Sequence, residues 1–154
     1  TVGIMQVGQQ YCADNNSNPD DIVAKSLHPD MNGFHFQVVC VTHQSWGAIK
    51  GLQSGEFGPH NGYEQMDYAG LLGLTEQTVT ALKALDPESI NDLSGGTVVF
   101  KIGTTEIPFT CENFIQSFAL PNLYFHATTA YDILRMQGAP LGKMNFLGQM
   151  RIGA

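Results

Sequence analysis

The chain has 154 residues, the length of one typical domain, and its 43% hydrophobic and 10% aromatic content is enough to fill a core. Only 14% of the residues are charged, and 7 Lys and Arg against 14 Asp and Glu give a net charge of −7. This acidic balance argues against binding to nucleic acid or to an anionic membrane, since both need a basic surface.

The sequence contains no apolar run near the ~18 residues that a membrane-spanning helix needs. Its three cysteines, Cys12, Cys40 and Cys111, are an odd number without CxxC spacing. This pattern argues against a disulfide framework and against a thiolate zinc site. We therefore expect a single domain over residues 1–154, with free thiols and a cytoplasmic location.

In chain order, the first half predicts three elements. A short element at residues 2–12 precedes a loop rich in Asn, Asp and Ser at 13–19. Asp20 and Asp21 are expected to cap a short helix that ends at Leu27, before a proline. Residues 34–52 predict a helix, because their apolar side chains recur on one face at about 100° per residue. A strand at 36–42 is the alternative, since that stretch is rich in β-branched residues.

The second half predicts two further long helices with a hairpin between them. After a glycine-rich loop at 51–62, Asp67 is expected to be the N-cap of a helix that ends near Leu85. Residues 97–102 and 105–110 predict a β-hairpin, in which Pro108 must lie on an edge strand or beyond the ladder. The longest helix is predicted at 112–137, with Gly138 as its C-terminal cap and an aperiodic tail at 142–154.

The last predicted helix carries an unusual line of polar side chains. Asn122, His126 and Thr129 project at spacings of four and three residues into the middle of its apolar face, while Ser117, Thr128, Asp132 and Arg135 mark the solvent side. A core-facing polar group must find a partner, because leaving it unpaired costs about 1–3 kcal/mol. The line therefore either bonds to backbone near Pro121 or lines a cavity for a ligand, a metal or water.

The other histidines give weaker signals. His35 lies at the core boundary of the first long helix, and His43 lies almost opposite its apolar stripe, facing solvent or a second subunit. His28 and His60 fall in Pro- and Gly-rich loops and are expected to be solvated. No HxxxH or HExxH motif is present, so a metal held by His126 with His35 or His43 is a minor alternative.

Other catalytic motifs are absent from the sequence. There is no GxSxG, and Gly95-Gly96 precedes a hairpin rather than the helix that a phosphate loop requires. General acid–base chemistry by His126 is the enzymatic option that remains, with a pKa tuned by burial.

The C-terminal third resembles a known family. Residues 118–135 read FALPNLYFHATTAYDILR, and GAPLGK at 138–143 and FLG at 146–148 follow. This string is similar to that of a domain-of-unknown-function family in the DinB/YfiT-like superfamily, and LHPDM at 27–31 with FQV at 36–38 resembles a second segment of that family. The resemblance covers roughly residues 27–148.

The resemblance implies a mainly α fold, a DinB-like up-down four-helix bundle with a β-hairpin before the last long helix, and a homodimer. DinB-like relatives often bind a divalent metal through three histidines, two of them four residues apart on one helix. The matching positions here are His126 and Ala130. We therefore expect no metal or other cofactor, with a metal-dependent enzyme as an alternative.

These observations lead to three hypotheses on function. The first is a small-molecule-binding protein, with or without cofactor-independent isomerase or lyase activity on a fairly apolar substrate. His126 is then the acid/base, Asn122 orients a carbonyl or hydroxyl, and the pocket is formed by Gln37, His35, Thr129, Trp46, Phe118 and Phe125. The second is a divalent-metal enzyme, and the third is a non-catalytic dimeric module whose polar line is structural.

Overall fold

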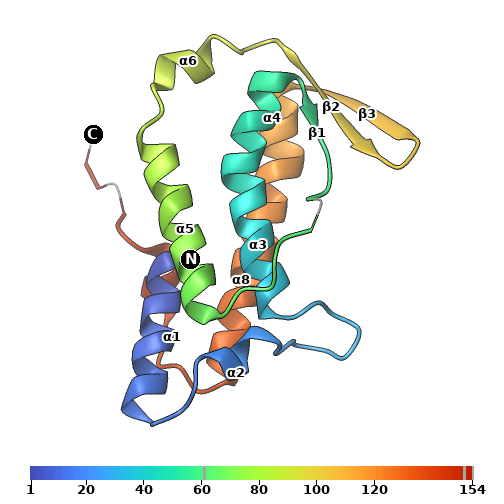
Figure 1. Cartoon of the computed structure of the whole chain (residues 1–154). Helices are drawn as coiled ribbons and strands as arrows, with labels where there is room; N and C mark the ends of the chain where they lie inside the picture. The colour runs from blue at the N-terminus through green and yellow to red at the C-terminus, as the bar shows by residue number, and fades with distance from the viewer. Residues whose placement is uncertain (61, 151, 154) are drawn as a thin grey trace.

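The computed structural model describes residues 1–60, 62–150 and 152–153. The single helices are α1 (Val2–Asp14), α2 (Asp20–Val23), α5 (Tyr68–Lys83), α6 (Pro87–Asn91) and α9 (Lys143–Leu147). Two longer helical segments are continuous but composite, and we call them rods. The first rod consists of α3 (Phe34–Thr42), η1 (His43–Gly47) and α4 (Ala48–Ser54), and the second consists of α7 (Cys111–Asn113), η2 (Phe114–Ala119) and α8 (Leu120–Met136). Figure 1 shows α1, α5, α3 and α8 side by side. The predicted mainly α architecture is confirmed.

The first rod confirms the helix predicted at 34–52 and excludes the strand alternative. It continues to Ser54, and its middle turn at His43–Gly47 is a π-helix. There the hydroxyl of Ser45 donates to the carbonyl of Val41 at 2.7 Å. Single π-helical turns inside α-helices are frequent at functional sites. The rod packs against α8 and α5, so its π turn lies close to both.

Helix α5 begins where the sequence predicts. The Oδ1 atom of Asp67 accepts a hydrogen bond from the Gly70 N–H at 2.7 Å, which is the expected N-cap. The helix ends at Lys83, two residues before the predicted end. Beyond it, Asp86 is extended with ψ of 119°, as the following Pro87 requires.

The prediction for Asp20 is wrong in its detail. Helix α2 spans only Asp20–Val23, and its N-cap residue is Pro19. The Oδ1 atom of Asp20 instead accepts a hydrogen bond from the Tyr68 N–H at 2.9 Å, which ties α2 to the start of α5. The Phe34 N–H donates to the Lys25 carbonyl at 2.8 Å, so the chain must turn before the predicted helix end.

The predicted hairpin is confirmed at both ends, and a third strand extends it. Strands β2 (Thr97–Ile102) and β3 (Thr105–Thr110) are antiparallel, with Val99 opposite Pro108. Strand β1 (Glu56–Phe57) pairs in parallel with β2, giving the order β1-β2-β3. Pro108 therefore lies on an edge strand, where its missing N–H is tolerated.

Two segments predicted to lack regular structure contain short elements. Strand β1 falls in the predicted loop at 51–62, and α9 falls in the predicted tail at 142–154. Residue 61 of that loop and residues 151 and 154 of that tail lie outside the described residues.

The buried side chains form two hydrophobic clusters. The larger lies between α1, α3, α5 and α8, where the rings of Phe34 and Tyr68 stack at 5.6 Å. The smaller joins α4 and the sheet to the second rod and contains Phe57, Val98 and Phe114. The three cysteines are free and buried within the fold.

The two faces of α8 largely follow the sequence pattern. Thr128 and Arg135 are exposed, whereas Ala130 and Ile133 are buried. Met136, the last residue of α8, is 61% exposed, because the chain turns at Gly138 and places Ala139 and Leu141 in the core instead.

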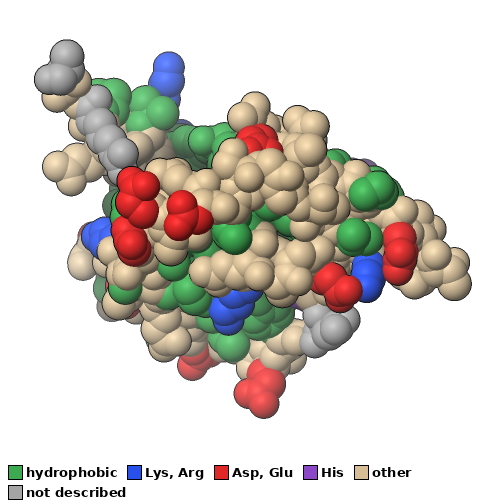
Figure 2. All heavy atoms as spheres, turned by 90° about the horizontal axis from the view of Figure 1, so that it is seen from above, with side chains coloured by type: hydrophobic (Ala, Val, Ile, Leu, Met, Phe, Trp, Pro, Cys, Tyr) green, Lys and Arg blue, Asp and Glu red, His purple; other side chains and the backbone are tan. Residues whose placement is uncertain are grey.

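The surface agrees with an acidic protein. On the face seen in Figure 2, lysine and arginine side chains stand apart from one another and do not form a patch. Of the helices in the described ranges, none is long and apolar enough to cross a membrane.

Candidate functional site

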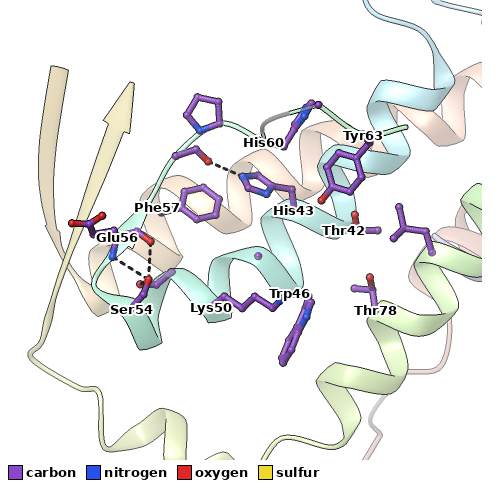
Figure 3. Close-up of a pocket in the computed structure, with 16 residues that line it drawn as sticks. Thr42, His43, Trp46, Lys50, Ser54, Glu56, Phe57, His60, Tyr63 and Thr78 are labelled. Carbon is purple, nitrogen blue, oxygen red and sulfur yellow. Dashed lines mark hydrogen bonds between the residues drawn. The ribbon is translucent and has the colours of Figure 1, made fainter. Parts of the chain in front are cut away.

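A pocket of about 700 Å³ lies between the first rod, strand β1 with the chain that follows it, and helix α5 (Figure 3). We call it the His60 pocket. Trp46 and Lys50 line it from the first rod, His60 and Tyr63 from the chain after β1, and Thr78 from α5. These residues are up to 32 positions apart in the sequence (46 to 78), so the pocket depends on the packing of three elements.

His43 holds the chain after β1 against the first rod. Its Nε2 atom donates to the carbonyl of Gly58 at 2.8 Å, and its ring stacks on Phe57 at 4.6 Å. Gly47, one turn along the π-helix, leaves room for the ring, since a Cβ there would lie 2.9 Å from Nδ1. Burial lowers the pKa of His43, an effect that the Gly58 bond partly offsets. The neutral ring therefore acts as an anchor for this chain segment.

His60 is the polar group at the centre of this region. Its ring lies 5.2 Å from that of Phe36, 5.8 Å from that of His43 and 5.4 Å from that of Tyr63. Its Nδ1 atom is buried and has no hydrogen-bond partner among the described residues. Burial lowers the pKa of His60, and repulsion from His43 and His35 lowers it further. The expectation that His60 is solvated is wrong for Nδ1, because the chain after β1 folds this atom inward.

The charged residues of the pocket lie at its edge. Lys50 is exposed, and its Nζ atom lies 5.3 Å from the centre of the Trp46 ring. The carboxylate of Glu56 points away to a different partner, Lys101, at 2.5 Å. An ammonium over an indole face is an attractive cation–π contact.

The predicted acid/base residue His126 lies outside the lining of this pocket. Its Nδ1 atom is 2.8 Å from Oε1 of Gln37, whose Nε2 donates to the carbonyl of Asn32 at 2.8 Å. Burial lowers the pKa of His126, and repulsion from His60 lowers it further. The two residues, both predicted to line one ligand pocket, thus contact each other across two helices. Phe36 lies between this pair and His60, with its ring 5.9 Å from that of His126 and 5.2 Å from that of His60.

The other two members of the polar line bond within their own helix. The Nδ2 atom of Asn122 donates to the carbonyl of Phe118 at 2.7 Å, and the hydroxyl of Thr129 donates to that of Phe125 at 2.8 Å. Both side chains thus satisfy backbone groups one turn back. For Asn122 this is the structural alternative that the sequence left open, whereas His126 bonds to the side chain of Gln37 and not to backbone.

The remaining predicted residues are dispersed. Nε2 of His35 lies 3.3 Å from both the Met66 nitrogen and the Glu64 carbonyl oxygen, so it contacts the chain before α5. Phe118 packs 4.7 Å from Phe100 in the smaller hydrophobic cluster. Phe125 is 57% exposed beside His126. Of the eight predicted site residues, Trp46 lines the His60 pocket.

Sequence reasoning missed His60 and Tyr63. One signal points to them: in the glycine-rich stretch at 51–62 and just after it, Phe57, His60 and Tyr63 recur every three residues. Large aromatic side chains are unusual in a solvated loop, and their presence indicates a segment that packs against the rest of the protein.

The side chains do not fit the three-histidine metal site of DinB-like relatives. His126 is followed one turn later by Ala130, which is fully buried, and its Nδ1 is engaged by Gln37. Within the described part of the chain, no group of three or more His, Cys, Asp or Glu side chains is placed to hold a metal ion.

Comparison with known proteins places the chain among uncharacterised relatives. The family described as "Domain of unknown function (DUF1993)" matches residues 1–147. The crystal structure of a DinB family member from Shewanella denitrificans is similar with a TM-score of 0.79 and 23% sequence identity, over 98% of this chain and 85% of that one. No curated protein matches the chain. The likeness to the solved structure shows the fold alone.

Proposed function

Because the chain belongs to the DUF1993 family of domains of unknown function and has a DinB-like fold, its function must be argued from its own geometry, and we propose that it binds an apolar small molecule in the His60 pocket. The volume of about 700 Å³ supports this proposal, since small-molecule sites span roughly 300–1,000 Å³.

The observation that carries the proposal is the buried Nδ1 atom of His60. It has no hydrogen-bond partner among the described residues, although leaving such an atom unpaired costs about 1–3 kcal/mol. Nδ1 is closed to solvent in this structure, so a hydroxyl, carbonyl or amide group of a ligand supplies the partner when the His60 ring turns toward the pocket. Binding is thereby favoured over an empty pocket by a specific contact as well as by apolar burial.

The walls around His60 suit a fairly apolar ligand. Trp46, Phe57 and Tyr63 contribute aromatic faces, and Thr78 contributes a hydroxyl from α5. The lining also contains the polar side chains of Thr42, His43 and Ser54, and polar groups between aromatic walls are what orients a small organic molecule in a binding site.

His60 also supports a chemical step. A lowered pKa keeps its imidazole neutral near pH 7, so the ring can accept a proton from a bound ligand. We propose cofactor-independent proton transfer, of the isomerase or lyase type, as the reaction class.

A second candidate base is His126, and one observation favours it. The amide of Gln37 is oriented by Asn32, so Oε1 accepts the Nδ1 proton of His126 and leaves its Nε2 as the basic nitrogen. A folded His126→Ala variant that retains all activity rules out this role for His126. The corresponding His60 variant then decides between the two rings.

A thermal-shift screen of apolar compounds tests the binding proposal. Compounds that stabilise the wild type should lose at least about fivefold in affinity in His60→Phe, which keeps a ring and removes both nitrogens. The control is His28→Phe, because His28 is exposed and contacts Asp30 outside the pocket. Stabilising compounds that bind His60→Phe as well as the wild type contradict the proposal, and so does a screen without any stabilising compound.

Three further expectations are proposals as well. The arrangement of α1, α5 and the two rods supports an up-down four-helix bundle of the DinB kind. The homodimer is carried over from the resemblance and is tested by light scattering of the purified protein. The expectation of no metal rests on the donor set around His126 and is tested by elemental analysis, with His126→Ala as a control.

A further inference from the structure

We propose that the ligand of the His60 pocket carries one acidic group, a carboxylate or a phosphate, which binds to Lys50 while the apolar body contacts Trp46. This inference rests on the proposed function, and it names the chemical class of the ligand.

The charged side chains that line the pocket favour a negatively charged ligand group. Lys50 and Glu56 are the charged residues of its lining, and Glu56 is paired with Lys101 at 2.5 Å. Within the described ranges, no carboxylate lies within 4.0 Å of the Lys50 ammonium. The pocket therefore presents a cation whose charge is not neutralised by an ion pair.

The position of Lys50 places its charge next to an apolar wall of the pocket. Its ammonium lies over the indole of Trp46, 5.3 Å from the ring centre, so the charge is held beside an apolar wall of the pocket. The chain as a whole has a net charge of −7, so attraction of an anion to this pocket must come from Lys50 itself. A ligand with an acidic group is thus directed to the one edge of the pocket where a lysine lies.

The side of the pocket opposite Lys50 determines where the second polar group of the ligand lies. Figure 3 shows Lys50 and Trp46 on the helical side and His60 and Tyr63 on the far side, above the pocket. The acidic group and the polar group that meets His60 must then lie at different ends of the ligand. The expected class is a ring-containing or aliphatic acid with a second polar group.

Two fluorescent probes with one ring skeleton separate the charge from the apolar body. Anilinonaphthalene sulfonate is anionic, and phenylnaphthylamine lacks the sulfonate. Trp46 is the sole tryptophan of the chain, so energy transfer from it to either probe reports binding. Both probes are titrated into the wild type, Lys50→Gln and Lys50→Arg, with Lys83→Gln as the control, since Lys83 is exposed on α5 away from this pocket.

The expected result is a selective loss. Lys50→Gln should weaken the sulfonate probe about two- to fivefold relative to the neutral probe, the size expected for an exposed ion pair. Lys50→Arg and Lys83→Gln should leave the ratio of the two affinities unchanged. An unchanged ratio in Lys50→Gln overturns this inference and leaves the pocket itself standing, whereas failure of both probes to bind the wild type overturns the pocket as well.

Competition then identifies the acid. Displacement of the sulfonate probe by naphthoate assigns a carboxylate to the ligand class, and displacement by naphthyl phosphate assigns a phosphate. Displacement by neither compound, or equal displacement by the uncharged naphthyl alcohol, contradicts the proposal.

Discussion

The Nδ1 atom of His126 lies 2.8 Å from Oε1 of Gln37, which is 89 residues earlier in the chain and on the facing helix α3. Gln37 is buried, and its other amide atom donates to the carbonyl of Asn32. One side chain thereby joins α8, α3 and the loop before α3. This contact connects the polar line of α8 to the rest of the core without requiring a ligand.

Replacing Gln37 with leucine should destabilise the fold. The change leaves the Nδ1–H of His126 and the Asn32 carbonyl without their partner, at a cost of about 1–3 kcal/mol. Urea unfolding measures the difference. Gln53→Leu is the control, since Gln53 is exposed on α4 and its replacement should stay within about 0.5 kcal/mol. Equal unfolding free energies for the two variants would show that the His126–Gln37 contact contributes nothing.

Gly47→Ala and Gly73→Ala should have opposite effects on the stability of the folded protein. A Cβ at Gly47 would lie 2.9 Å from the His43 ring, which Phe57 and Gly58 hold in place, so strain of about 1–3 kcal/mol is expected. A Cβ at Gly73 meets nothing within 4 Å, and alanine in this helix interior should stabilise by about 0.5–1 kcal/mol. Thermal melts of both variants test the pair. A stable Gly47→Ala protein would mean that His43 does not need its observed position.

Acid should destabilise the protein through three histidines. Burial lowers the pKa of His43, His60 and His126 below the ordinary value of 6.5 in the folded state. The unfolded chain then binds more protons as the pH falls below 6.5, so their contribution to stability is present above that pH and is lost through the folded-state pKa values. Urea midpoints between pH 7.5 and pH 5 should therefore fall. His60→Phe should flatten this slope, and a midpoint that rises on acidification would refute the assignment.

Asn122→Ala should leave ligand binding in the His60 pocket unchanged. The amide of Asn122 donates a hydrogen bond to the carbonyl of Phe118, and Asn122 does not line that pocket. The variant should lose about 0.5–1.5 kcal/mol of stability through this bond alone. Parallel melting and binding curves check both parts. A large loss of affinity in a folded Asn122→Ala protein would restore the role that the sequence suggested for this residue.

The features predicted correctly depend on neighbours in the sequence. The N-cap of α5 needs only Asp67 and Gly70, and the hairpin needs two β-rich runs around Gly103. The helix at 34–52 follows from the period of its apolar residues. Each signal acts over a few residues, so a single sequence contains it.

The features that were missed depend on distant contacts. The sequence around Asp20 predicts a helix cap, but its carboxylate accepts a hydrogen bond from the N–H of Tyr68, which is 48 residues later in the chain. His60 lies in the pocket because Phe57 pairs with Phe100 on β2 and because His43 holds Gly58. Neither pairing can be read from the sequence, so the recurrence of Phe57, His60 and Tyr63 indicates only that the segment packs and not that it forms the wall of a site.

The most direct test of the central claim uses the only tryptophan of the chain as a reporter in the His60 pocket. Acrylamide quenching of Trp46 fluorescence is measured with and without a compound that stabilises the wild type in the thermal-shift screen. The account predicts that the compound protects Trp46 from quenching and that the protection is lost in His60→Phe but kept in His28→Phe. Stabilisation without any change in the quenching of Trp46 would contradict it, because the compound would then bind somewhere else.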